Sequence, residues 1–251
     1  MPKIRKSDSW KVFCGLRKKK EWPEYLPVRP SSRDKATLHL NKFYALHQAA
    51  SRFQYAKFKG FSNATSTGQG YSAFMGYTLA WSSYNALYSV PWSFCEKMED
   101  HEDGKRALGA LPELFKKLQQ HHSEEEFRVM ISSLILPLNG FRGHFRKNEK
   151  LKISVTATAG SPVRDQLNKV INKKTSFGIK EPSSQKDPYN LAKIFCGAAY
   201  SLRNSSVHGQ ATPHWFNGTK TNLKIIENFK VALLDVTWAV FSGLVLVDKP
   251  K

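Results

Sequence analysis

The sequence predicts an all-α fold, a bundle of about six helices in a single domain. Apolar residues recur at three- to four-residue spacing through most of the chain, which is the period of an amphipathic helix. Two long stretches, residues 70–95 and 231–247, carry almost no charge, as helices buried on all sides do. The 251 residues would also allow two small domains, but no repeat and no boundary marks a second one.

The first 33 residues differ in character from the rest of the chain. They are basic, contain Pro23, Pro27 and Pro30, and show no clean periodicity. We therefore expect a basic N-terminal extension, residues 1–33, packed on the main domain, residues 34–251. The run RKKK at residues 17–20 is typical of a solvated surface, and a contact with phosphate is the alternative.

Helical patterns begin directly after the extension. Capping residues precede an apolar stripe between Leu38 and Phe58, and Gly60 is a suitable stop signal. Ser123, followed by three acidic residues, is a good helix N-cap with the favourable dipole sign. Further helices are predicted over residues 71–90, 91–99, 107–122 and 123–141.

Residues 140–186 form the least regular part, which we expect to be a basic insertion. KLKISVTATA, residues 150–159, alternates and is rich in β-branched residues, so a short β-hairpin is possible there. Residues 161–174 begin with Ser-Pro and favour a short helix. The last two helices are expected over residues 188–204 and 222–247, the first opened by Asp187-Pro188.

The net charge of the chain predicts the class of molecule that it binds. Thirty-nine Lys and Arg against twenty Asp and Glu give a net charge of +19, which attracts nucleic acid and, as an alternative, an anionic membrane surface. The two uncharged stretches approach membrane-spanning length, but their composition favours buried helices, so we expect no stable membrane insertion. Three dispersed cysteines and an N-terminus without an apolar core favour a cytoplasmic protein with neither disulfide framework nor metal site.

The stretch LRNSSVHG, residues 202–209, allows two interpretations. One is a helix end that is polar by chance, and the other is a phosphate-handling pair, Arg203 and His208. Cleavage of RNA requires a base for the ribose 2′-OH, an acid for the leaving 5′ oxygen and a cation for the phosphoryl charge. Histidine titrates near neutrality and the arginine fork matches phosphate, while Asn204 could orient either side chain. This chemistry needs no cofactor.

The same stretch resembles the R-N-x-x-x-H motif of the HEPN superfamily of helical ribonucleases and RNA-binding domains. WSSYNALY, residues 81–88, is similar to the aromatic–asparagine helix that precedes this motif in many such domains, with Trp81, Tyr84, Asn85 and Tyr88 as the matching features. The resemblance implies a HEPN-like helical bundle, commonly a homodimer, in which two Arg–His motifs face one composite cleft.

The resemblance also implies a function. Active HEPN members are metal-independent endoribonucleases, often toxins or antiviral defence effectors, and some have an antitoxin or another regulatory partner. The tyrosine that antitoxins modify in some of them is Gln210 here. A non-catalytic RNA-binding or regulatory module is the alternative, and a membrane-associated interaction protein is a third.

Other basic and aromatic residues are candidates for contacting RNA. Lys147 and Lys150 lie in a basic stretch with one aromatic residue, Lys173 and Lys174 follow the short helix, and Trp215 could stack on a base. For each, an ordinary surface or packing role is the alternative. His121 and His122 fit solvated side chains better than metal ligands.

Overall fold

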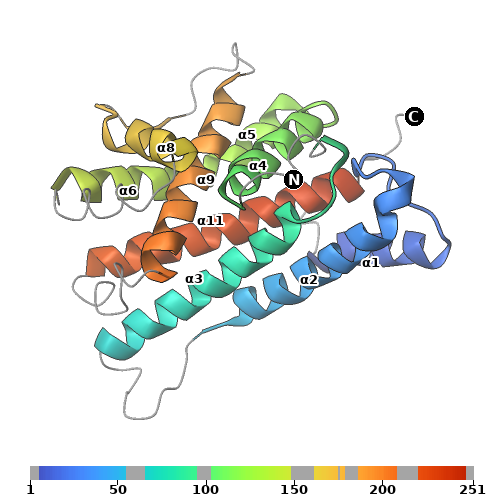
Figure 1. Cartoon of the computed structure of the whole chain (residues 1–251), viewed down its shortest axis with the longest axis horizontal. Helices are drawn as coiled ribbons and strands as arrows, with labels where there is room; N and C mark the ends of the chain where they lie inside the picture. Colours follow the sequence, from blue (N-terminus) through green and yellow to red (C-terminus); the bar gives the residue numbers. More distant parts are fainter. Residues whose placement is uncertain are drawn as a thin grey trace.

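The computed structural model describes residues 6–54, 66–94, 103–147, 161–174, 176–178, 186–207 and 220–246 (Figure 1). Over these residues the chain is helical and contains no strand, only an isolated bridge between Val28 and Trp92, so the prediction of an all-α fold is confirmed. The elements are α1 (Lys6–Lys18), a 3-10 turn η1 (Pro30–Ser32), α2 (Arg33–Arg52), α3 (Ser66–Tyr88), α4 (Asp103–Gln119), α5 (Glu124–Ser132), α6 (Ile135–Lys147), α8 (Ser161–Ile171), α9 (Lys186–Val207) and α11 (Lys220–Val245).

Most predicted helices are present, with different ends. The single helix expected over residues 123–141 is instead α5 and α6, separated by a turn at Ser133 and Leu134. The hydroxyl of Ser133 donates to the Met130 carbonyl at 2.8 Å and competes with the helical bond pattern. Pro137 lies in the first turn of α6, where the backbone N–H that proline lacks has no helical partner in any case.

The region expected to be an irregular insertion is partly helical. Residues 140–147 complete α6, and α8 (Ser161–Ile171) begins where the short helix over residues 161–174 was predicted but ends three residues earlier. The possible hairpin at residues 150–159 lies outside the described residues. Of the expected helix over residues 91–99, residues 91–94 form a bridge and a turn, and the remainder also lies outside the described part.

The N-terminal extension contains a helix that its sequence does not reveal. Phe13 of α1 is fully buried, and the Trp10 ring stacks on Tyr44 of α2 with centroids 4.2 Å apart. The Ser9 hydroxyl forms a buried hydrogen bond of 2.9 Å with that of Ser242 in α11. Only a few residues of α1 reach the core, so its stripe is too short to show a period.

The two uncharged stretches form core helices. In Figure 1, α3 and α11 run through the middle of the bundle, with α2 beside α3 and with α9 crossing α11. Among the described helices, Leu223–Val245 of α11 is long and apolar enough to cross a membrane by length and composition, and 67% of its apolar window is buried inside the protein. Burial by neighbouring helices accounts for the apolar character of this segment.

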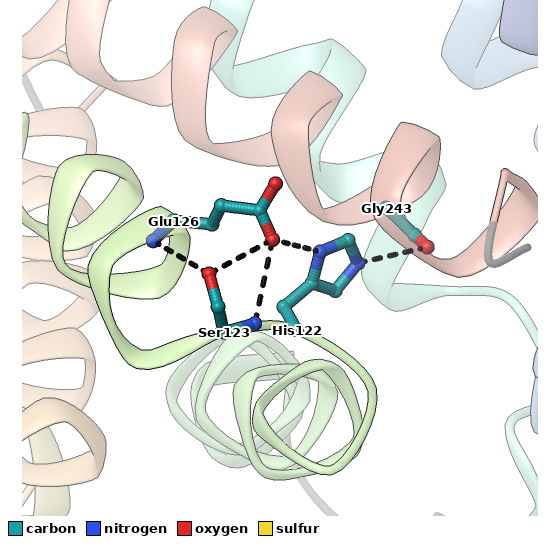
Figure 2. A network of polar contacts seen from close by, with 4 residues as sticks. All are labelled: His122, Ser123, Glu126 and Gly243. Atoms are coloured by element: carbon teal, nitrogen blue, oxygen red, sulfur yellow. Dashed lines mark hydrogen bonds and ion pairs between the residues drawn. The ribbon is translucent and has the colours of Figure 1, made fainter. Parts of the chain in front are cut away.

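A polar network joins the turn between α4 and α5 to the end of α11 (Figure 2). Ser123 and Glu126 form a reciprocal capping box, which lowers the pKa of Glu126 chiefly through the Ser123 hydroxyl. The His122 ring lies 3.5 Å from the Glu126 carboxylate and 3.2 Å from the Gly243 carbonyl. His122 is therefore half-buried and bonded within the fold, not simply solvated as expected, whereas His121 is exposed beside the Tyr25 ring.

Close packing of α8 against α9 generates the first prediction. A Cβ at Gly197 would lie 2.5 Å from the Cβ of Gln166, which cannot move without the α8 backbone. We expect Gly197→Ala to lower the free energy of unfolding by about 1–3 kcal/mol in chemical denaturation, despite the better helix propensity of alanine.

The matched control is Gly143→Ala in α6, where an added Cβ meets nothing within 4 Å. It should raise the free energy of unfolding by about 0.5–1 kcal/mol. Equal effects of the two substitutions would contradict the close approach of α8 and α9.

Candidate functional site

Tyrosine hydroxyls of α3 fix the position of α9. The Tyr77 hydroxyl donates to the Ala199 carbonyl at 2.6 Å, inside the core. In an α-helix that same carbonyl also accepts the backbone N–H four residues later, which belongs to Arg203. One turn before Ala199 in α9, the Cys196 sulfur lies 3.3 Å from the Tyr84 hydroxyl. The Tyr84 hydroxyl donates to the Ala107 carbonyl of α4. The turn that carries Arg203 is thus bound to α3.

Arg203 is half-buried and has no acidic partner within the described part of the chain. Its Nη1 donates to the Asn204 side-chain oxygen at 2.9 Å, and Asn204 is itself buried. This hydrogen bond to Asn204 holds the guanidinium without neutralising it. A guanidinium that lacks a carboxylate keeps its charge and most of its donors for an anion.

Arg203 lines a cavity of about 360 Å³ between α2, α3 and α9. From α2 come His39, Lys42 and Leu46, which lie three and four residues apart and hence on one face of that helix. The α3 wall is uncharged but polar, and Thr78, Ser82 and Asn85 are also spaced at helical intervals; Ser89, directly after the helix, continues it.

The cavity is electropositive. Lys42 and Arg203 supply two charges, and no carboxylate is among its lining residues. The pKa of His39 is lowered, first by burial and then by the charges of Lys42, Lys35 and Arg106. His39 is therefore neutral at pH 7 and offers one donor and one acceptor.

An acidic residue of α4, Asp103, is hydrogen-bonded to α3. Asp103 accepts a hydrogen bond of 2.6 Å from the Tyr88 hydroxyl, which in turn accepts from the Asn85 amide nitrogen. Burial, followed by the hydrogen bond to Asp103, raises the pKa of Tyr88. This chain fixes the Asn85 amide and leaves its oxygen near Ser89, at 3.5 Å from that hydroxyl.

The structure brings together the two sequence segments that carry the resemblance. Trp81 and Asn85 line the same cavity as Arg203, whereas Tyr84 and Tyr88 are buried behind it. Helix α9 continues through Val207, beyond the end expected near residues 204–206. His208 follows Val207 directly and lies outside the described residues.

Of the other predicted RNA contacts, the two whose side chains the structure describes, Lys173 and Lys174, lie away from this cavity. Lys173 and Lys174 follow α8, where their carbonyls accept from Arg142 at 3.3 and 3.2 Å and the Lys173 ammonium lies 4.2 Å from the Phe177 ring centre. Neither residue lines the cavity. Lys147 ends α6, with a side chain outside the described set, and Lys150 and Trp215 also lie outside the described residues.

Sequence reasoning missed His39 and Lys42. The helical period places both on one face of the predicted first helix together with Leu46. That grouping is detectable, but it has no functional meaning until α2 is packed against α3. The spacing in the sequence therefore shows that these residues share a helix face, but only the packing of α2 against α3 shows that this face lines a cavity.

Comparison of the chain with known protein families, with curated protein sequences and with solved structures finds no match.

The contact between Tyr77 and Ala199 generates a second prediction. Tyr77→Phe removes the buried hydroxyl but leaves the Ala199 carbonyl its helical partner, so we expect a loss of about 1 kcal/mol in the free energy of unfolding. Tyr25→Phe is the control, because the Tyr25 hydroxyl bonds to no described residue, and it should change stability by less than about 0.5 kcal/mol. A Tyr77→Phe protein as stable as the control would show that the bond does not hold α9.

Cys196, a buried residue of α9, gives a prediction for alkaline pH. Burial raises the pKa of this thiol to about 12, whereas an unfolded cysteine has a pKa of about 8.5. The unfolded chain therefore releases this proton first, so stability is full below about pH 8.5 and falls as the pH rises toward 12, with a slope of up to about 1.4 kcal/mol per unit.

Denaturation of wild type and Cys196→Ala between pH 8 and 10 isolates this contribution. The wild type should lose stability over this window more steeply than the variant. Parallel pH profiles would mean that the thiol titrates normally in the folded protein.

Proposed function

We propose that the protein is a cytoplasmic, metal-independent endoribonuclease of the HEPN type. The observation that carries the proposal is the position of Arg203: an arginine with no acidic partner among the described residues lines an electropositive cavity with Trp81 and Asn85. These residues come from the two segments whose sequences resemble the HEPN pattern. The net charge of +19 supports a polyanionic substrate.

In the proposed reaction the ribose 2′ oxygen attacks the adjacent phosphorus and the bond to the 5′ oxygen breaks. The products are a 2′,3′-cyclic phosphate and a free 5′-hydroxyl, so no water is consumed in this step. A base takes the 2′-OH proton and an acid gives a proton to the 5′ oxygen, and His208 is suited to either role. Arg203, oriented by Asn204, stabilises the charge that develops on the phosphoryl oxygens.

One imidazole cannot be base and acid at the same moment. A homodimer that juxtaposes two Arg203–His208 pairs would supply both groups, which is why we propose a dimeric enzyme. A toxin or an antiviral defence effector, restrained by an antitoxin or another regulatory partner, is the proposed cellular role. The alternative, a non-catalytic RNA-binding module, is supported by the same cavity, because binding a phosphate requires Arg203 but not His208.

Incubation of labelled RNA with purified protein in EDTA tests the proposal. Wild type should cut the RNA and leave cyclic phosphate ends, and His208→Ala and Arg203→Ala should each be slower by about 100-fold or more. The control is Lys224→Ala, an exposed lysine of α11 that does not line the cavity, which should cut at the wild-type rate.

Cleavage by His208→Ala at the wild-type rate would refute the assigned role of this histidine. Tight RNA binding by the wild type without cleavage would replace the enzyme with the binding module.

A further inference from the structure

We infer that the outer face of α1, together with the lysine run at its end, docks the protein on an anionic lipid bilayer. The contact is peripheral and electrostatic, and it requires no segment to cross the membrane. It lies on the N-terminal extension, whereas the candidate RNA site lies between α2, α3 and α9. Docking on a bilayer does not require that the protein cut RNA, so the two proposals can fail separately.

The first support is an open, basic face of α1. The apolar side of this helix is packed on α2 and α11. The residues of the opposite face lie at helical spacing: Lys11, Val12, Gly15, Lys18 and Lys19. The lysines and Val12 are exposed, and a Cβ added at Gly15 would meet nothing within 4 Å. This face advances about 12 Å along the helix, so several of its side chains can contact one flat surface together.

The second support is the charge around this face. Residues 6–35 contain nine Lys and Arg against four Asp and Glu, a higher net charge per residue than that of the whole chain. One of these acids, Asp34, lies 3.2 Å from the Arg17 guanidinium. Lys11 and the run Lys18–Lys20 are exposed and form no ion pair with any described residue. Their charges therefore remain available to an anionic partner.

The third support is the backbone of Lys20. Helix α1 ends in a Schellman motif, in which the Lys20 N–H donates to the Arg17 carbonyl at 3.0 Å and the Glu21 N–H to the Leu16 carbonyl at 2.8 Å. Lys20 has a φ of 60° and is the only described non-glycine residue with a positive φ. Glycine is favoured at this position because a Cβ strains the left-handed conformation. A strained residue whose exposed side chain forms no described ion pair indicates a role outside the fold.

The apolar residue of the stripe indicates which anionic partner fits. Val12 is 40% exposed and directly follows Lys11. A phosphate backbone of nucleic acid offers this aliphatic side chain no apolar contact. At a bilayer interface, by contrast, an apolar side chain reaches toward the acyl boundary while lysine stems extend to the headgroups. Ammonium groups are attracted by the surface potential of anionic lipids without needing a bidentate geometry. The face therefore suits an anionic bilayer better than a nucleic acid.

Sedimentation of the full chain with lipid vesicles tests the inference. Vesicles of phosphatidylcholine and phosphatidylserine supply the anionic surface, and vesicles of phosphatidylcholine alone are the neutral reference. We expect binding to the anionic vesicles only. This binding should be lost when the salt concentration rises from about 0.1 M to about 1 M, because the screening length falls from about 10 Å to about 3 Å.

A double substitution locates the contact. Lys18→Gln/Lys19→Gln should lower the partition coefficient about 25-fold, since each lysine near an anionic surface contributes about fivefold. The matched control, Lys169→Gln/Lys224→Gln, removes the same charge from α8 and from the start of α11. In Figure 1 these two sites lie at the end of the bundle away from α1. The control should therefore bind as tightly as wild type.

Lys20→Gly separates binding from folding. Glycine adopts this φ without strain, so the variant should have a higher thermal midpoint than wild type and still bind anionic vesicles about fivefold more weakly. Loss of folding would not produce this pattern. Val12→Ser should weaken binding to vesicles several-fold and leave binding to RNA unchanged, because only a bilayer offers the valine an apolar contact.

Absence of binding to anionic vesicles by the folded wild type overturns the inference. Equal losses in Lys18→Gln/Lys19→Gln and in the control also overturn it, because binding would then follow net charge and not this face. Weaker binding of the lysine variant to RNA, with unchanged binding to vesicles, would identify nucleic acid as the partner instead. If the wild type docks through α1 but does not cut RNA, the enzyme proposal fails and the inference stands.

Discussion

The hydrogen bond from the Tyr77 hydroxyl to the Ala199 carbonyl is the contact on which the candidate site depends. It binds the uncharged helix α3 to the turn of α9 that bears Arg203. Two further contacts of α3 act in the same direction: Tyr84 reaches α4 and Cys196, and Tyr88 binds Asp103. All three hydroxyls are buried or nearly so. Breaking any of these hydrogen bonds therefore leaves a polar group that water cannot reach. Helices α3, α4 and α9 are therefore fixed relative to one another, and the cavity wall with them.

In this arrangement, different helices supply the uncharged and the charged groups of the cavity. Helix α3 contains no charged residue, so it can be buried on its tyrosine face and can still offer hydroxyl and amide groups on the other. The cations come from its neighbours, Lys42 from α2 and Arg203 from α9. No carboxylate is among the described residues that line the cavity, so the lining has the positive sign of the whole chain. A local site and a global charge of the same sign both favour an anionic ligand.

The sequence was sufficient for the fold class and for most helices, because three- and four-residue spacing and the Ser123 cap are local signals. It failed where a helix depends on distant partners. Helix α1 is held by the stacking of Trp10 on Tyr44 and by the hydrogen bond between Ser9 and Ser242. No local sequence pattern predicts these contacts. The same distinction between local signals and distant contacts applies to the candidate site. Arg203 and Asn204 could be named from a short motif, whereas His39 and Lys42 come to line the cavity only when α2 lies against α3. Lys173 and Lys174 matched the composition of an RNA contact but lie after α8, away from the cavity lining.

A crystal structure of the protein with a bound 2′-deoxy dinucleotide tests the central claim, that Arg203 is a phosphate ligand, most directly. The account predicts a phosphate oxygen within about 3 Å of the Arg203 guanidinium, with Asn204 still bound to its other side. A nucleotide bound elsewhere on the surface, with Arg203 contacting Asn204 alone, would contradict it.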